Sequence, residues 1–224
     1  MTEDHYEAVD RYLEERYAPG NDALMAALAA NDVARLPSIA VSPTQGKLLQ
    51  ILARMIQARR ILEIGTLGGY SSLWLAGALP ADGCLITLEL NARHAAVARG
   101  NFVRAGLADR IELREGPALD SLAKLQAEGV DPFDFFFIDA DKPNGPNYVN
   151  WALKLAHRGS VIVIDNVIRD GAIVNEHSGD PAVRGTRLLH DMIAAEPRLS
   201  ATAIQTVGAK GYDGFTIALV TAHP

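Results

Sequence analysis

Phe133-Asp-Phe-Phe-Phe-Ile-Asp-Ala-Asp-Lys142 is the most informative stretch of the sequence, and Val161-Ile-Val-Ile-Asp-Asn166 repeats its pattern. Both stretches begin with a short apolar run rich in aromatic or β-branched residues, as buried strands are. Both then end abruptly in carboxylates or amides. Because parallel strands of an α/β sheet end at the same edge, where such folds bind ligands, these polar side chains are expected to lie together.

These polar side chains predict a metal site. Three oxygen donors, from Asp139, Asp165 and Asn166, could converge on one divalent cation, with Lys142 within reach. Oxygen donors with one amide among them suit Mg²⁺, Mn²⁺ or Ca²⁺ rather than zinc. Each residue alone could instead be a loop cap or a surface charge. Their joint placement after two strands favours a site for a metal-bound, ionisable oxygen substrate.

Apolar runs and helical patterns alternate along the middle of the chain. Strands are expected at 61–64, 84–88, 110–114, 133–138 and 160–164. Helices are expected near 70–79, 91–105, 117–128, 144–157 and 184–195. Alternation of this kind predicts an α/β fold, a doubly wound parallel sheet with right-handed crossovers.

The two ends of the chain depart from this alternation. Two β-like runs, 201–207 and 214–220, are joined by a linker over 208–214 that is too short for a crossover helix, so they should form an antiparallel hairpin. Helical patterns are expected at the other end over 4–17, then to Ala30, and from Ser42-Pro43 to about Arg59. We expect one domain over 1–224, with 1–40 as a helical extension packed on it.

The composition bounds the class of protein. Of 224 residues, 21% are charged and 49% apolar, the range of a soluble globular protein. The apolar runs are too short for a membrane span, and the acidic N-terminus lacks the features of a signal peptide. The single Cys84 cannot form an internal disulfide, so a cytoplasmic location is expected. The net charge of −6 weakens the case for nucleic acid as the main partner, although Arg54, Arg59 and Arg60 could form a local basic patch.

A glycine-rich turn follows the first strand, in Ile61-Leu-Glu-Ile-Gly-Thr-Leu-Gly-Gly-Tyr-Ser71. Its glycines would let the backbone approach a ligand, but their spacing is not that of a dinucleotide site, and an ordinary tight turn is the alternative. Glu63, just before the turn, suits a ligand that is partly cationic. Glu89 ends the second strand, where an acid can accept both hydroxyls of a ribose. Arg93 and His94 follow; such residues more often face solvent, though one of them could lie along an adenine ring.

Together these motifs resemble the class I S-adenosylmethionine-dependent methyltransferases. More narrowly, they resemble the cation-dependent O-methyltransferases related to caffeoyl-CoA and catechol O-methyltransferases, in a bacterial-type form. The resemblance runs from about Val41 to Val220. It implies a Rossmann-like sheet of seven strands in the order 3-2-1-4-5-7-6, with strand 7 antiparallel, which agrees with the hairpin expected at the end of the chain.

The resemblance also implies a role for particular residues. In the cofactor site it implies that Glu63 and Gly65 line the methionine end of S-adenosylmethionine, with Glu89 at the ribose. The other implied cofactor contacts come from Val41, Thr66, Tyr70, Ser71, Ala118 and Asp139. It implies that the metal ligands are Asp139, Asp165 and Asn166, and that Lys142 is the catalytic base beside Asp139. The loop from Arg169 to Asp180 carries no recognisable substrate signature, which leaves the acceptor open.

Three functions compete at this point. The first is methyl transfer to a small phenolic acceptor with two neighbouring hydroxyls, a catechol. The second is methylation of a hydroxylated tRNA base by the same site, against which the net acidity counts. The third is a non-catalytic S-adenosylmethionine-binding protein, against which the intact Lys142 and ligand set count. The resemblance further implies a homodimer, and the N-terminal helices carry apolar residues suited to one: Tyr6, Leu13, Tyr17 and Leu24.

Overall fold

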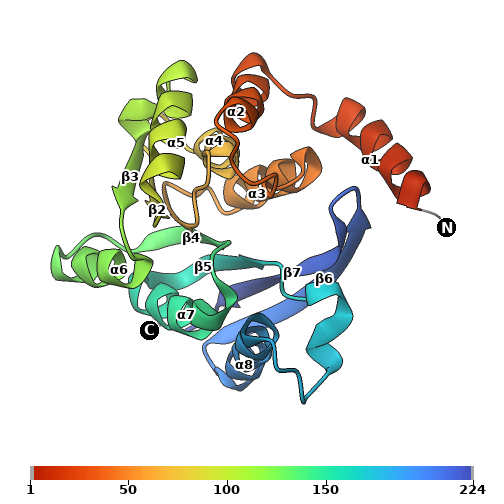
Figure 1. The fold of residues 1–224 in the computed structure, drawn as a ribbon. Coiled ribbons are helices and arrows are strands. Elements are labelled where there is room, and N and C mark those ends of the chain that lie inside the picture. Colours follow the sequence, from red (N-terminus) through yellow and green to blue (C-terminus); the bar gives the residue numbers. More distant parts are fainter. Residues whose placement is uncertain (1–2, 223–224) are drawn as a thin grey trace.

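The computed structural model describes residues 3–222 and shows a mixed sheet covered by helices on both faces (Figure 1). The seven strands lie in the order β3-β2-β1-β4-β5-β7-β6, and β7 runs antiparallel to both of its neighbours, so the predicted fold is confirmed. The strands are β1 (Arg60–Ile64), β2 (Cys84–Glu89), β3 (Ile111–Glu115), β4 (Phe133–Ile138), β5 (Ala156–Asp165), β6 (Leu199–Gly208) and β7 (Gly211–Val220).

Helices connect the strands and precede the sheet. The α-helices are α1 (Glu3–Tyr17), α2 (Asp22–Val33), α3 (Pro43–Met55), α4 (Tyr70–Ala76), α5 (Ala92–Arg104), α6 (Ala118–Ala127), α7 (Gly145–Leu155) and α8 (Pro181–Ala195). Short 3₁₀ turns are η1 (Ala108–Arg110), η2 (Lys142–Asn144) and η3 (Arg169–Val174). Within residues 3–222, none of these helices combines the length and the apolar character that a membrane crossing requires.

The core forms two layers because neighbouring strand residues point to opposite faces of the sheet. On β4, Phe135 and Phe137 pack with α3, α4 and α5 on one face, whereas Phe136 and Ile138 pack with α6, α7 and α8 on the other. All four side chains are buried. Burying a side chain of this size is worth about 1.5–3 kcal/mol, so the central strands are held firmly and can support polar groups at their ends.

The ends of β4 and β5 lie side by side. Ile138 pairs with Ile164, so the next residues along each strand, Asp139 and Asp165, come to neighbouring positions at the carboxyl edge. The N–H of Asp139 also donates to the carbonyl of Ile64 at 2.9 Å, which ties this point to the end of β1. The polar residues that follow the two apolar runs therefore lie together, as expected.

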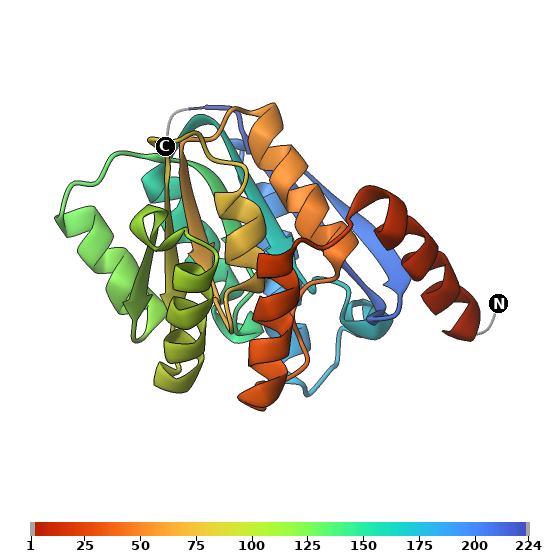
Figure 2. The same cartoon turned by 90° about the horizontal axis from the view of Figure 1, so that it is seen from above.

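Three predicted boundaries were wrong. Strand β5 begins at Ala156 rather than at residue 160, because α7 already ends at Leu155. Helix α3 ends at Met55 rather than near Arg59, because Gln57 adopts a left-handed backbone (φ 55°) and the chain then enters β1. The loop expected over 208–214 is a two-residue turn, since β7 begins at Gly211, which has a φ of 87°. Helix α1 lies beside the tip of this hairpin (Figures 1 and 2), where the Asp10 carboxylate accepts the N–H of Ala209 at 2.7 Å.

Asp134 and His157 form a hydrogen-bonded clamp at the opposite end of the sheet from the carboxyl edge. Asp134 accepts the N–H groups of Arg59 and Arg60, each at 2.8 Å, which directs the chain into β1. His157 Nε2 lies 2.8 Å from Asp134 Oδ1, and its Nδ1 lies 2.8 Å from the carbonyl oxygen of Arg158. Both oxygens can only accept, so the ring donates from both nitrogens when it is protonated. The hydrogen bond to Asp134 accordingly raises the pKa of His157, against the opposing effect of its partial burial.

This clamp predicts a pH-dependent contribution to stability. A raised histidine pKa stabilises the fold fully below the unfolded value of about 6.5, and that contribution is lost as pH rises through the folded value. The His157 side chain is 39% exposed, so screening limits the effect to below about 1 kcal/mol. We expect His157→Gln to lower the melting temperature by about 2–4 °C at pH 5.5 and by less at pH 9. The same difference in melting temperature between the native protein and His157→Gln at both pH values would contradict the assignment.

Candidate active site

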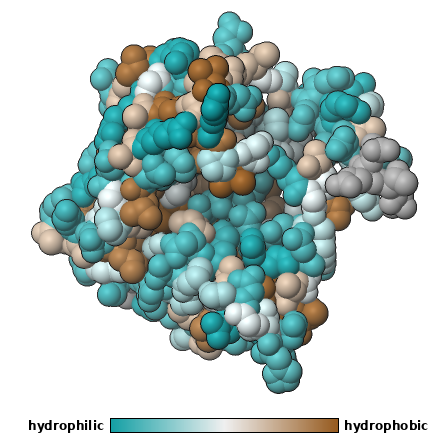
Figure 3. Space-filling model, viewed as in Figure 1, coloured by the Kyte–Doolittle hydropathy of each residue, from teal (hydrophilic) through white to brown (hydrophobic). Residues whose placement is uncertain are grey.

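A cavity of about 810 Å³ opens at the carboxyl edge of the sheet. Figure 3 shows this face of the molecule, where hydrophilic and hydrophobic residues mix around a central hollow. Its walls come from the ends of β1, β2, β4 and β5 and from the segments that follow them. The predicted residues that line it are Val41, Gly65, Thr66, Tyr70, Ser71, Glu89, Ala118, Asp139, Lys142 and Asn166.

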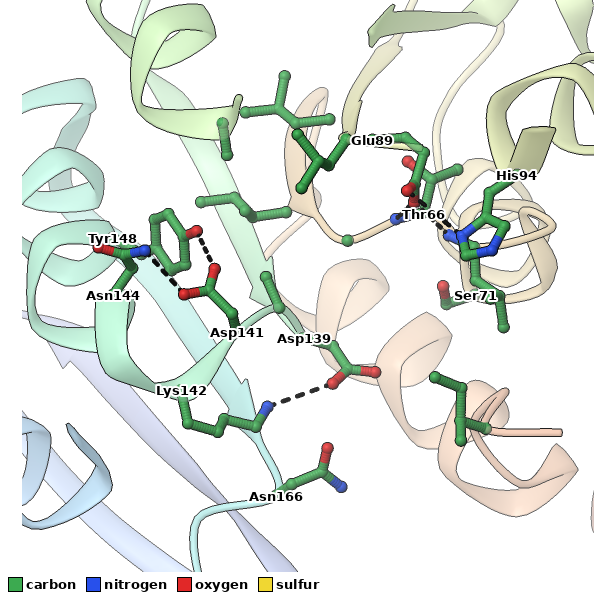
Figure 4. A pocket seen from close by; sticks show the side chains of 18 of the residues that line it. Thr66, Ser71, Glu89, His94, Asp139, Asp141, Lys142, Asn144, Tyr148 and Asn166 are labelled. Atoms are coloured by element: carbon green, nitrogen blue, oxygen red, sulfur yellow. Dashed lines mark hydrogen bonds and ion pairs between the residues drawn. The ribbon is translucent and has the colours of Figure 1, made fainter. Parts of the chain in front are cut away.

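Lys142 stands at the junction of the two strand ends. Its Nζ donates to the backbone carbonyl of Asp165 at 3.0 Å and lies 3.4 Å from Asp139 Oδ1. Asn166, which has a left-handed backbone (φ 55°), donates its N–H to Asp165 Oδ1 at 2.9 Å. In Figure 4 the Lys142 ammonium, the Asp139 carboxylate and the Asn166 amide point toward one another. The structure thus brings these predicted residues together.

Asp165 lies behind this group rather than on the cavity wall. Its side chain is buried, and burial raises its pKa, as does the negative charge of Asp139. Hydrogen bonds from Asn166 and Gln45 and the charge of Lys142 act in the opposite direction. A buried carboxyl group beside a second, partly exposed one favours a neutralising cation. Across residues 3–222 no cluster of three or more His, Cys, Asp or Glu side chains could hold a metal, so a cation here would depend on the Asn166 amide as the third donor. That donor set of two carboxylates and one amide fits a hard divalent ion.

Glu63 does not line the cavity. It is fully buried beneath the glycine-rich turn, where its carboxylate accepts hydroxyl hydrogen bonds from Ser71 at 2.5 Å, from Thr87 at 2.6 Å and from Ser72. Burial raises the pKa of Glu63 to about 7 despite these hydrogen bonds. Ser71 lines the cavity, and its hydroxyl donates to Glu63. Glu63 can therefore influence the site only by orienting Ser71.

Glu89 shapes the turn as well as the cavity. Its Oε2 accepts the N–H groups of Thr66 at 3.2 Å and Leu67 at 2.8 Å, and its Oε1 accepts the N–H of Asn91 at 2.8 Å. His94 Nδ1 lies 3.4 Å from Oε1, and Figure 4 shows the His94 ring beside Glu89. His94 lines the cavity, and its predicted contact with an adenine ring stays a prediction.

Sequence reasoning missed a polar group on the wall opposite Glu89. Asp141 accepts hydrogen bonds from the hydroxyl of Tyr148 at 2.5 Å and from the amide of Asn144 at 2.7 Å, as Figure 4 shows. Burial raises the pKa of Tyr148, and Asp141 raises it further, so the hydroxyl stays a donor. The signal was present, because these residues follow at helical spacing of three and four positions, which places them on one face.

Two glycines allow the backbone segments of the site to approach closely. A Cβ atom on Gly65 would overlap the carbonyl oxygen of Asp139. A Cβ atom on Gly185, in α8, would overlap the carbonyl oxygen of Lys142 and approach Pro143 Cα to 2.7 Å. The Lys142 backbone therefore rests directly on the backbone of α8.

A family model described as O-methyltransferase matches residues 18–220. The chain belongs to this O-methyltransferase family, and the predicted resemblance is confirmed.

Individual relatives agree with this membership. A catechol O-methyltransferase of Mycobacterium tuberculosis is 55% identical over 212 residues, covering 95% of this chain and 94% of the relative. An O-methyltransferase of Bacillus cereus, solved in complex with SAH, superposes with a TM-score of 0.96 at 52% identity, covering 98% of this chain and 100% of that one. An O-methyltransferase of Streptomyces achromogenes involved in tomaymycin synthesis, solved with SAM, gives a TM-score of 0.96 at 49% identity, with 99% and 100% covered.

Glu89 carries a prediction for cofactor binding. Glu89→Ala would remove the acceptor predicted for the ribose hydroxyls and would also free the Thr66 and Leu67 N–H groups, a loss of about 1–3 kcal/mol. We expect calorimetry to show S-adenosylhomocysteine binding weakened by roughly 10- to 100-fold. Glu115 pairs with Glu89 in register, is 40% exposed and does not line the cavity, so Glu115→Ala is the matched control. Equal affinities for the two variants would mean that the ribose lies elsewhere.

Proposed function

We propose that this O-methyltransferase methylates one hydroxyl of a small ortho-dihydroxy aromatic, a catechol-like acceptor, and depends on a divalent cation to do so. The observation that carries the proposal is the meeting of Asp139, Asn166 and Lys142 at the neighbouring ends of β4 and β5. Two adjacent hydroxyls can chelate one cation, which fixes the oxygen that faces the methyl group. The name catechol O-methyltransferase, carried by the Mycobacterium tuberculosis relative, supports the same acceptor class.

The cofactor would lie across the glycine-rich turn. Glu89 would accept the ribose hydroxyls, and Ala118 would lie by the adenine. Glu63 would act by orienting Ser71 from below. The methionine end is assigned to Val41, Gly65, Thr66, Tyr70, Ser71 and Asp139.

Asp139, Asp165 and Asn166 would hold the cation, which we take to be Mg²⁺, with Mn²⁺ and Ca²⁺ as alternatives. When bound, such a cation lowers the pKa of an adjacent phenol from its usual value of about 10 by stabilising the oxyanion. The Lys142 Nζ would accept the hydroxyl proton. The acceptor oxygen then takes the methyl group from the sulfonium, and S-adenosylhomocysteine leaves. The Asp165 carbonyl fixes the direction of Nζ, so that Lys142 is positioned before the acceptor arrives.

A labelled-methyl assay tests this function. The enzyme is given labelled S-adenosylmethionine with catechols, with single-hydroxyl phenols and with tRNA, each with Mg²⁺ and with excess chelator. We expect methylated catechols only where the cation is free. Catechol methylation that persists in chelator would remove the cation from the proposal. Methyl transfer to tRNA but not to catechols would show that the acceptor is a nucleic acid and not a small phenol.

A homodimer is part of the same proposal. Leu24 is buried in the core and cannot contribute to an interface, but Val9, Tyr12 and Tyr17 on α1 are 42%, 56% and 67% exposed. We infer that residues 1–40 form an extension of a single methyltransferase domain and that a second copy covers this apolar surface. Light scattering at micromolar concentration is expected to give twice the chain mass of 24.0 kDa. A mass of one chain would count against the dimer.

A further inference from the structure

Arg169 follows the candidate metal ligands along the chain and lines the cavity together with Lys142 and Asn166. Its backbone is left-handed (φ 55°), a conformation that a long side chain rarely adopts. Asp213 holds it there, because Asp213 Oδ1 accepts the N–H groups of Ile168 at 2.9 Å and Arg169 at 3.1 Å. The chain thus maintains an unfavourable backbone at a position that places an arginine on the cavity wall, and this points to a role for the side chain.

The Arg169 guanidinium lacks partners. Over the described part of the chain its side chain makes no hydrogen bond, and its Nε is buried without an acceptor. Asp213 Oδ2 is 3.9 Å from Nη1, which is too long for a hydrogen bond. By contrast, Arg187 donates to the carbonyl of Ile173 on the same loop. With 32% of its side chain exposed, Arg169 keeps a buried Nε–H without an acceptor and Nη groups that are free to bind a ligand in the cavity.

The ligand that would satisfy these donors is an anion. A planar guanidinium matches a carboxylate or phosphate through two parallel hydrogen bonds. A cavity of about 810 Å³, already shared with the cofactor, is of the size that takes one small molecule more readily than a large carrier-bound one. A carboxylate on a small aromatic acceptor meets both conditions.

We propose that Arg169 binds a carboxylate of the acceptor, so that the preferred substrate is a small catechol carrying a carboxylate on its ring or on a short side chain. This inference rests on the proposed catechol methylation and names the acceptor class within it. Arg169 is then a specificity residue, which contacts the substrate away from the oxygen that is methylated.

Two nearly isosteric acceptors test this assignment, 3,4-dihydroxybenzoate and 3,4-dihydroxybenzamide. The measured quantities are the acid-to-amide ratio of kcat/KM with Mg²⁺, and the same ratio of affinities by calorimetry with S-adenosylhomocysteine and Mg²⁺ bound. We expect the native enzyme to prefer the acid. Arg169→Met keeps the aliphatic length and the same backbone strain but removes the donors. It should lower both ratios by about 10- to 100-fold, through KM rather than kcat. Arg169→Lys, which keeps the charge but not the paired donors, should fall between.

Arg158→Met is the matched control, since it removes one positive charge from an exposed position at the opposite end of β5. Both ratios should stay at the native value in that variant. Ratios for Arg169→Met within twofold of native would overturn the assignment even when both catechols are methylated. If Arg169→Met does not fold, a native enzyme that binds acid and amide equally overturns it. A native enzyme that neither binds nor methylates either compound would instead refute the proposed function, and the acceptor class with it.

Discussion

Lys142→Ala is expected to lower turnover on a catechol at pH 7 by about 10²–10⁴-fold, the usual contribution of a general base. The Lys142 Nζ lies 3.4 Å from Asp139 Oδ1 and 3.0 Å from the carbonyl oxygen of Asp165, where the proposed acceptor hydroxyl would meet it. Calorimetry should show S-adenosylhomocysteine bound as in the native enzyme, because Lys142 is not among the residues assigned to the cofactor. Steady-state kinetics on the purified variant measure the loss.

The pH dependence separates a base from a positioning charge. The deficit of Lys142→Ala should shrink as pH rises toward the pKa of the acceptor hydroxyl, because solvent then generates the oxyanion. Lys142→Arg should rescue little, since a guanidinium stays protonated. Near-normal turnover of Lys142→Ala at pH 7 would leave the cation as the main activator of the hydroxyl.

Asp165→Ala is expected to reduce the Mg²⁺-dependent activity to the level of the chelated native enzyme. The variant loses one of two carboxylates and leaves Asp139 and Asn166 as the remaining donors, too few to hold a hard cation tightly. Calorimetry should show cofactor affinity little changed, since Asp165 does not line the cavity. Asp191→Ala, which removes an exposed acid from α8, is the control for charge. Activity of Asp165→Ala that still responds to Mg²⁺ as in the native enzyme would exclude Asp165 as a ligand.

The fold was largely predictable from the sequence because burial and alternation act through local patterns. The fully apolar runs before Asp139 and Asp165 identified neighbouring strands, and the short linker identified the hairpin. The end of α3 was not predictable, because it depends on a left-handed backbone at Gln57, a residue type that rarely adopts that conformation. The early start of β7 likewise depends on a tight turn that the Asp10 carboxylate supports.

The sequence predicted which strand ends meet at the cavity, but not the orientation of each side chain there. Strand-end chemistry located Lys142 and Asn166 on the cavity wall. It could not distinguish Glu63, whose carboxylate turns inward to hydroxyl partners, from a residue that faces the ligand. The group around Asp141 was missed because its order depends on Tyr148, a residue that reads from the sequence as part of a helix core. Tertiary hydrogen bonds, which no local pattern records, decide these orientations.

Gly185 is a position where a small substitution would disturb the site, although the residue lies outside the cavity. It belongs to α8, yet the absence of a side chain there lets the Lys142 backbone pack directly against this helix. Even alanine there would force η2 and α8 apart and displace Lys142, the residue proposed to accept the proton. The activity would then be lost through one carbon atom added on a covering helix, with no change to any residue that lines the cavity.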